Sequence, residues 1–276
     1  MGQTYIIGKY VYDRILLLME KVLNRVKEYS FLFEQLVSRD FKRKYKRTVL
    51  GMLWSVLSPL LMLFVMRMIF INFFGSSTPH YTIYLFAGII VMSFYREATK
   101  TGMTSLVQNT AIVTKINVPK YLFIFSRNVS AFVNFALTLG VFFVYCLVDR
   151  ISFSPSFLML IFPSITLTLM NIGTGMILSC LYIFFRDMTY LYDVFLTLLN
   201  YLSAVFYTID RFAIGIQQLF LLNPVYAHIR YFRMIVIENA IPGIGYHGLL
   251  LLYALIFLAI GFYMYKRYNY QFIYYL

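Results

Sequence analysis

The side chains best suited to chemistry in this chain are cations that lie beside apolar sequence. Arg39, Lys42, Arg43 and Lys46 fall in one short run, directly before an apolar stretch that begins near residue 49. Cations at such a boundary attract anionic lipid head groups, by about 1 kcal/mol for each residue. Arg67 lies inside the apolar stretch. An arginine at that depth is costly, so it either faces a partner or a wet path, or it extends along the helix toward the membrane surface.

Other kinds of site are missing from the sequence. The phosphate-binding pattern G-x-x-x-x-G-K-[ST] does not occur, so we do not expect the chain itself to hydrolyse ATP. His80, His228 and His247 are widely separated, and no H-x-x-x-H or C-x-x-C pair exists, so no metal site is expected. Asp193 is the only carboxylate well inside an apolar stretch, whereas an ion-driven carrier usually needs more polar groups there.

The composition indicates a membrane protein. Of the 276 residues, 61% are hydrophobic and 13% are charged, against about 45–50% and about 25% in average soluble domains. A soluble core of this size cannot bury so much apolar surface. Because one crossing takes about 20 apolar residues, the chain has room for roughly six membrane-spanning helices. The sequence therefore predicts an all-α polytopic membrane protein.

The first 48 residues differ from the rest, because they carry eleven Lys or Arg and no apolar run of membrane length. We interpret residues 1–29 as a charged cytoplasmic leader and residues 30–48 as an amphipathic helix. Apolar side chains recur there every four positions, at Tyr29, Phe33, Val37, Phe41 and Tyr45, with cations around the remaining surface. Such a helix is expected to lie flat at the cytoplasmic membrane surface. The alternative is a solvated basic helix without special contacts.

Residues 49–276 form the predicted transmembrane domain. Its apolar runs are separated by turn signals such as Pro79 and Pro155. Gly173 and Gly175 are expected to let helices approach closely, either within the bundle or between two copies. The six predicted spans are residues 49–73, 81–104, 121–148, 157–185, 191–209 and 247–265.

The basic residues set the orientation of these spans. With the N-terminus on the cytoplasmic side, the inner segments hold 19 Lys or Arg and the outer segments hold 4. This is a strong positive-inside bias. An even number of spans places the C-terminus on the cytoplasmic side as well, together with Lys266 and Arg267.

Residues 212–242 do not have the pattern of a simple crossing. They are apolar in places but are interrupted by Asn223, Pro224, Arg230 and Arg233. Pro224 ends any helix that precedes it. Two short re-entrant helices in the outer leaflet, between the fifth and sixth spans, fit this pattern better. Because broken backbone in a membrane must be shielded or line a wet cavity, these four residues are candidates for an outer gate.

Four segments together resemble the polysaccharide-type ABC-2 exporter permeases, the transmembrane subunits that move O-antigen, capsule and teichoic acid. SRDFKRKYKRTVLGMLWSVLSP (38–59) resembles the family's segment at the start of the first span, and NTAIVTKINVPK (109–120) resembles its loop between the second and third spans. FRD (185–187) is similar to the turn between the fourth and fifth spans, and LNPVY (222–226) with YFR (231–233) is similar to the outer re-entrant segment. The order of the segments matches the family's six-span topology, and only the leader 1–29 departs from it.

The resemblance implies a half-transporter in the bacterial cytoplasmic membrane. Two copies would form the pathway, and two copies of a separate ATP-binding cassette subunit would hold the ATP and Mg²⁺. This chain would then have no cofactor, no catalytic residue and no nucleic-acid partner. Two cytoplasmic segments would receive the motion of the ATPases, with an ordinary turn as the alternative for each. The residues concerned are Asn109, Lys115, Pro119 and Lys120 in the first segment, and Arg186 and Asp187 in the second.

A lipid-linked polysaccharide, the substrate that the resemblance implies, needs cations for its phosphate and flat rings for its sugars. The head-group candidates are Arg39, Lys42, Arg43, Lys46 and Arg67. Tyrosine offers an apolar face together with a hydroxyl. The channel candidates are Tyr182, Tyr190, Tyr192, Tyr201 and Tyr207, each with core packing as the alternative. A permease for a drug or a simple lipid is the alternative function, followed by an ion-driven carrier or a membrane enzyme.

Overall fold

The computed structural model describes residues 29–42, 46, 49–74, 78–116, 118–210 and 212–275. Within these residues all regular secondary structure is helical, as the sequence predicts. Residues 1–28 of the predicted leader, Arg43 and Tyr45 of the predicted amphipathic helix, and residues 75–77 lie outside the described residues.

The helices follow one another with short connections. A helix over residues 29–42 comes first. It is followed by α2 (Leu53–Phe74), α3 (Tyr81–Thr104), η1 (Val107–Asn109), α4 (Thr110–Val113), α5 (Tyr121–Val148), η2 (Pro155–Leu160), α6 (Ile161–Phe184), α7 (Met188–Leu202), α8 (Ile214–Phe220), α9 (Pro224–Val236), α10 (Ile244–Tyr268) and α11 (Phe272–Tyr275).

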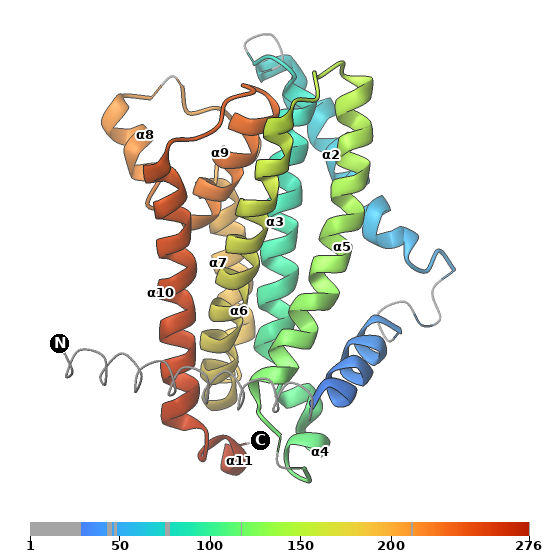
Figure 1. The fold of residues 1–276 in the computed structure, drawn as a ribbon, viewed down its shortest axis with the longest axis vertical. Coiled ribbons are helices and arrows are strands. Elements are labelled where there is room, and N and C mark those ends of the chain that lie inside the picture. The colour runs from blue at the N-terminus through green and yellow to red at the C-terminus, as the bar shows by residue number, and fades with distance from the viewer. Residues whose placement is uncertain are drawn as a thin grey trace, which may run out of the picture.

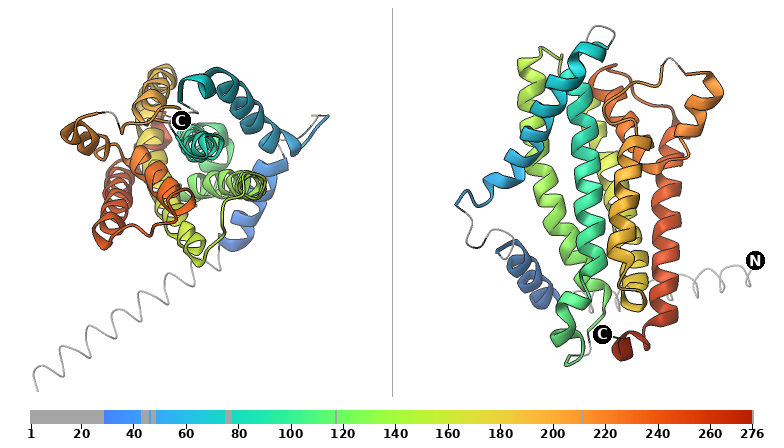
Figure 2. Two further views of the ribbon diagram at one scale, coloured as in Figure 1. Left: turned by 90° about the horizontal axis from the view of Figure 1, so that it is seen from above. Right: turned by 180° about the vertical axis from the view of Figure 1, so that it is seen from behind.

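The long helices form one bundle with α3 near its centre, as Figure 1 and the view from above in Figure 2 show. Sixteen of the 24 residues of α3 are buried. Glycine allows α6 to pack closely against two neighbours. A Cβ on Gly173 would lie 2.4 Å from the carbonyl carbon of Phe257 in α10, and a Cβ on Gly102 of α3 would lie 3.2 Å from the Cα of Gly175. The close approach predicted at these two glycines of α6 therefore occurs within one chain.

In the described part of the chain, four helices are long and apolar enough to cross a membrane: α2, α5, the continuous η2–α6 unit and α10. Helix α3 is equally long but carries Arg96, Glu97 and Lys100 in its C-terminal half. Helix α7 has only 15 residues, fewer than the about 20 of a full crossing. By length and composition these four helices are candidate spans, and the crossings by α3 and α7 remain predictions.

The fifth predicted span, residues 191–209, is helical only as far as Leu202. Ala204 then has a left-handed backbone with a φ of 46°. The guanidinium of Arg233 donates hydrogen bonds to the carbonyls of Ala204 (3.0 Å) and Val205 (2.8 Å). These carbonyls therefore have a side-chain partner in place of the helical one, a long-range contact that local sequence does not reveal.

The connections lie at two ends of the bundle. The helix 29–42, α4, the turn between α6 and α7, and α11 lie at one end, which we call the inner end (Figures 1 and 2). The opposite, outer end holds residues 78–80 and 149–154, joined by a hydrogen bond of 2.7 Å between Nδ1 of His80 and Oδ2 of Asp149. The segments that lie together at each end of the bundle are the same ones that the Lys and Arg count assigns to one side of the membrane. Which end faces the cytoplasm remains a prediction from that count.

Candidate coupling network and transport face

The helix 29–42 packs against the inner end through a line of residues that the sequence pattern does not select. Leu36 is 2% exposed and Asp40 is 3% exposed, whereas Phe33 and Val37 of the predicted apolar stripe are only half-buried. Leu36 packs in a cluster that includes Leu106 before η1. One face of the helix is therefore held by protein, and the adjacent apolar stripe stays partly exposed.

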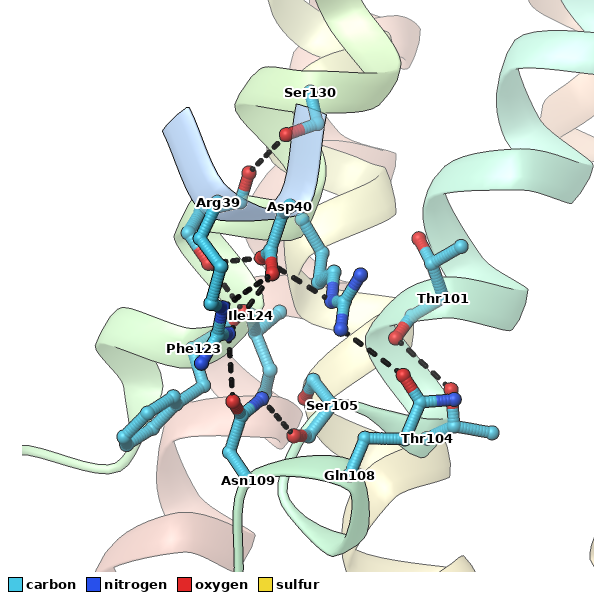
Figure 3. A network of polar contacts seen from close by, with 12 residues as sticks. Arg39, Asp40, Thr101, Thr104, Ser105, Gln108, Asn109, Phe123, Ile124 and Ser130 are labelled. Atoms are coloured by element: carbon cyan, nitrogen blue, oxygen red, sulfur yellow. Dashed lines mark hydrogen bonds and ion pairs between the residues drawn. The ribbon is translucent and has the colours of Figure 1, made fainter. Parts of the chain in front are cut away.

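Asp40 is the centre of a polar network at this contact (Figure 3). Its Oδ1 accepts a hydrogen bond of 2.8 Å from Nη2 of Arg39, and its Oδ2 lies 3.3 Å from Nε of Arg127 on α5. The hydroxyl of Ser126 donates to the same Oδ2 at 3.2 Å. The Asp40 side chain is 1% exposed and that of Arg127 is 12% exposed, so this ion pair is shielded from water.

The network extends directly to the first predicted coupling segment. Nη2 of Arg39 donates to Oδ1 of Asn109 at 2.6 Å, and Nδ2 of Asn109 donates to the carbonyl of Ser105 at 2.7 Å. Nη2 of Arg127 donates to Gln108 at 3.0 Å. The helix 29–42, η1 and α5 thus share one set of hydrogen bonds, and displacement of η1 must move the other two or break the set.

The second half of the inner end is tied together by the C-terminal residues. Nζ of Lys120, at the start of α5, donates to the carbonyl and to Oδ1 of Asn269, both at 2.8 Å, and partial burial lowers the pKa of Lys120. Nη2 of Arg186 donates to the carbonyl of Tyr275 at 3.1 Å, with its guanidinium 5.2 Å from the Tyr182 ring. Residues 269–275 therefore connect the two predicted coupling segments.

The other coupling candidates lie on the surface of this end. Lys115 and Asp187 are exposed, and Pro119 is half-buried. Asp187 precedes α7 but makes no side-chain cap to it. Exposed charges beside the shared network are available to a partner protein.

Above the inner end, an open-sided cavity of about 440 Å³ lies between α2, α3 and α7. Ser93 and Arg96 of α3 are exposed where they line it. Closer to the inner end, Nζ of Lys100 on α3 lies 2.6 Å from Oδ1 of Asp193 on α7, with the two side chains 44% and 47% exposed. The carboxylate of Asp193 thus has a cationic partner. A charged, open face on an otherwise apolar bundle is unsuited to contact with lipid tails.

The same region contains a partly buried polar connection between α2, α3 and α5. Nδ2 of Asn134 donates to Oε1 of Glu97 at 2.7 Å, and the hydroxyl of Ser55 donates to Oδ1 of Asn134 at 3.1 Å. These bonds fix the start of α2 against the two longer helices.

The five candidate channel tyrosines have different surroundings. Tyr190 and Tyr201 of α7 are 76% and 57% exposed, and Tyr207 is half-buried with its hydroxyl bonded to the carbonyl of Tyr201 at 2.8 Å. Tyr192 is 4% exposed and donates to the hydroxyl of Thr99 at 2.6 Å, so its ring lies in the core. Tyr182 lies beside Arg186 at the inner end.

The cationic head-group candidates are likewise separated. Arg39 is held by Asp40 and Asn109, although 38% of its side chain is exposed. Lys42, Lys46 and Arg67 are exposed. Arg67 lies on α2, four residues before Ile71 and well away from the inner end of that helix.

At the outer side, α8 and α9 lie between α7 and α10, where the sequence predicts two short helices. Asn223 caps α9, because its Oδ1 accepts hydrogen bonds from the backbone N–H groups of Val225 (3.0 Å) and Tyr226 (3.3 Å). Pro224 occupies the first helical position, where the missing N–H of proline costs no helical hydrogen bond. Arg230 forms an ion pair with Glu238.

Arg233, one turn further along α9, is 1% exposed. Besides the carbonyls of residues 204 and 205, it donates to the carbonyl of Tyr84 at 3.2 Å, and its guanidinium lies 3.4 Å from the Tyr84 ring centroid. A Cβ at Gly88 would approach its Nη2 to 3.0 Å. The side chain thus joins α9, α3 and the segment after α7.

Sequence reasoning missed Asp40, Arg96 and Arg127 as site residues. Asp40 carried one usable signal, since it is a single carboxylate within a run of cations. Arg96 carried another, because it lies in the C-terminal part of a predicted span. Nothing local in the sequence pairs Arg127 with Asp40, since 87 positions separate them.

Apolar helices of membrane-crossing length, with an open charged face between them, are typical of a helical membrane protein. Residues 32–237 match the family of the ABC-2 type transporter, and the chain belongs to this family. It is 25% identical over 248 residues to the O-antigen export system permease protein RfbA of Klebsiella pneumoniae, covering 88% of this chain and 95% of that protein. The RfbA permease of Myxococcus xanthus is 24% identical over 230 residues, covering 81% of this chain and 87% of that protein. The chain is therefore an ABC-2 permease, a transport subunit in a multi-pass membrane protein family.

Proposed function

We propose that this chain is the permease half of an exporter that moves a lipid-linked polysaccharide, of the O-antigen, capsule or teichoic-acid kind, across the bacterial cytoplasmic membrane. Two copies form the pathway, and ATP hydrolysis with its Mg²⁺ takes place in a separate ATP-binding cassette subunit. The names of the relatives support the substrate class, because both are called O-antigen export permeases.

The observation that carries the proposal is the polar face that α3 and α7 leave open. Arg96, Lys100 and Asp193 reach the surface there. Charged groups within a membrane face protein or a water-filled path, so a second copy must cover this face and enclose water. Helix α2 flanks the same cavity, and only 6% of its apolar window is buried within one chain, which leaves it free to pack against that copy.

The inner end suits the reception of force from an ATPase. The pair Asp40–Arg127 fixes the helix 29–42 to α5, and Arg39 connects Asp40 to Asn109 of η1. A displacement of η1 therefore moves the helix 29–42 and the inner end of α5, because side-chain hydrogen bonds join them directly. Residues 269–275 extend the same rigid unit to Arg186.

The proposal includes the six-span topology with both termini in the cytoplasm. Helix α3 lies at the centre of the bundle, where its three charges meet Asn134, Asp193 and the cavity and avoid lipid. Helix α7 starts at the inner end, and the segment after it continues outward under Arg233. In this arrangement α8 and α9 form the outer gate, and the apolar stripe of the helix 29–42 rests on the inner leaflet.

Deletion of the gene in its own host tests this function. We expect surface polysaccharide to disappear while the lipid-linked polymer accumulates inside the cell, with both effects reversed by the intact gene. Normal surface polysaccharide, with altered sensitivity to a drug or altered lipid composition, would instead establish the drug or simple-lipid permease.

A crosslinking experiment tests the dimer separately. A cysteine at Thr197, exposed on α7, should crosslink two copies in membranes. A cysteine at Ile165, exposed on α6 in the apolar groove that α6 forms with α5, serves as the matched control and should not. Equal crosslinking at both positions would count against an interface on the α3–α7 face.

A further inference from the structure

The cavity between α2, α3 and α7 contains a cation without a partner. Each of the other two charged residues in this part of α3 has one: Glu97 accepts from Asn134, and Lys100 pairs with Asp193. Within the described residues the guanidinium of Arg96 forms no hydrogen bond or ion pair, although it interacts electrostatically with the side chain of Tyr192. It lies eight residues before the end of α3, or about 12 Å into the bundle from the inner end.

The lining of this cavity is amphipathic, and its polarity runs along the bundle axis. Arg96, Ser93 and Ser58 occur with Trp54 toward the inner end, where Glu97 also lines the cavity with its carboxylate bonded to Asn134. Met62, Met66 and Ile89 occur toward the outer end, one to two turns further along their helices. A ligand that satisfies both ends carries an anionic, hydrogen-bonding head toward the cytoplasm and an apolar chain toward the membrane centre.

The guanidinium of Arg96 indicates which chemical group the head of the ligand carries. An unpaired arginine within a membrane protein is costly and is retained where it meets a partner. Its planar donors match phosphate oxygens in a bidentate geometry. Serine hydroxyls beside it add neutral donors. The volume of about 440 Å³ falls within the about 300–1,000 Å³ of small-molecule sites, enough for a phosphorylated head and the first part of a chain.

We propose that this cavity binds the phosphorylated head group of an inner-leaflet lipid, with Arg96 as the phosphate ligand and the Met-lined end as the seat of its apolar chain. The inference rests on the proposed function, since it takes the open face to line a conduit. Two sources supply this chemistry: an anionic phospholipid of the membrane, and the phosphorylated carrier of the glycan.

Trp54 offers a direct readout, because it is the only tryptophan in the chain and it lines the cavity. The purified chain, without ATPase or glycan, is placed in phosphatidylcholine nanodiscs, and indole emission is followed while a probe is added. The probes are geranylgeranyl diphosphate, phosphatidylglycerol, the uncharged geranylgeraniol, and inorganic pyrophosphate, which has no chain.

We expect a saturable change in Trp54 emission with a phosphorylated lipid and none with geranylgeraniol. Arg96→Gln should weaken that binding about tenfold or more, the loss of one charge-assisted interaction. Ser93→Phe keeps the charge but fills the space, and it should also abolish the response. Arg267→Gln, a matched loss of an exposed arginine at the end of α10, should bind as the unchanged protein does.

Tighter binding of the diphosphate lipid identifies the glycan carrier as the source, and tighter binding of phosphatidylglycerol identifies the membrane lipid; both support the site. An equal response to geranylgeraniol, equal affinity for inorganic pyrophosphate, or undiminished binding by both cavity variants would overturn it. If the chain supports export but Trp54 shows no response, the lipid site is refuted and the proposed function stands. If Trp54 responds but the chain exports nothing, the proposed function is refuted and the lipid site stands.

Discussion

Replacement of Arg233 by glutamine should destabilise the bundle far more than the same change at Arg230, although the two residues lie one turn apart on α9. Arg233 donates to three backbone carbonyls and stacks on Tyr84. Loss of a partner costs about 1–3 kcal/mol for each buried acceptor, and a desolvated cation–π contact adds about 2 kcal/mol. Release of the desolvation cost of the buried charge offsets several kcal/mol of this. We expect a net loss of about 2–4 kcal/mol.

Arg230 is the matched control. It pairs with Glu238, and the two side chains are 35% and 40% exposed. An exposed pair of this kind is worth about 0–1 kcal/mol, so Arg230→Gln should cost less than about 1 kcal/mol.

The free energy of unfolding is measured for both variants by circular dichroism, as rising SDS unfolds the protein in mixed micelles. Limited proteolysis should additionally cut the Arg233→Gln variant between residues 203 and 213. Equal stability of the two variants would refute the view that Arg233 holds the segment after α7 in place.

Three further outcomes follow from the contacts. Gly173→Ala should lower the unfolding free energy by about 1–3 kcal/mol, because the added methyl group overpacks against α10. Gly140→Ala has open space around its Cβ, so it should be neutral or stabilising by up to about 1 kcal/mol. The same SDS titration measures both changes. Asp40→Asn should leave a guanidinium poorly paired and reduce export per ATP hydrolysed, while the exposed-residue control Lys266→Gln should keep the ratio. Normal coupling in the first variant would contradict the network's role. Arg186→Ala should uncouple ATP use from export without loss of fold, as measured by the same ratio, and normal export would remove this assignment.

Much of the fold was predictable because membrane burial leaves a strong periodic signal. Apolar runs of crossing length locate α2, α5, α6 and α10. Asn223–Pro224 marks the start of α9 because its cap and its proline act locally. Local chemistry of this kind is visible in a sequence without any knowledge of the neighbours.

The misses share a physical cause, which is contact between residues far apart in the chain. The length of α7 is limited by Arg233, 31 positions after Leu202. The apolar stripe at Phe33 and Val37 suggested which face of the helix 29–42 is important, but Asp40 is buried on another face because Arg127 meets it there. The periodicity of apolar residues shows which helix face meets an apolar environment. It does not show where a buried ion pair forms.

The candidate site was predictable in outline and not in detail. The segment around Asn109 and the turn at Arg186 lie at the same end of the bundle, as the topology requires. The tyrosine candidates could not be sorted from sequence, because exposed Tyr201 and buried Tyr192 lie on one short helix and have the same composition around them. Only packing separates an exposed ring from one that fills the core.

Reconstitution tests the central claim most directly. The chain and an ATP-binding cassette subunit from the same organism are placed in proteoliposomes with a fluorescent lipid-linked oligosaccharide, and the glycan is probed by an enzyme confined to the other side of the membrane. The account predicts glycan transfer that requires ATP, requires both proteins and fails with a hydrolysis-deficient ATPase. Transfer by the permease chain alone, or ATP hydrolysis by the complex that never moves the glycan, would contradict it.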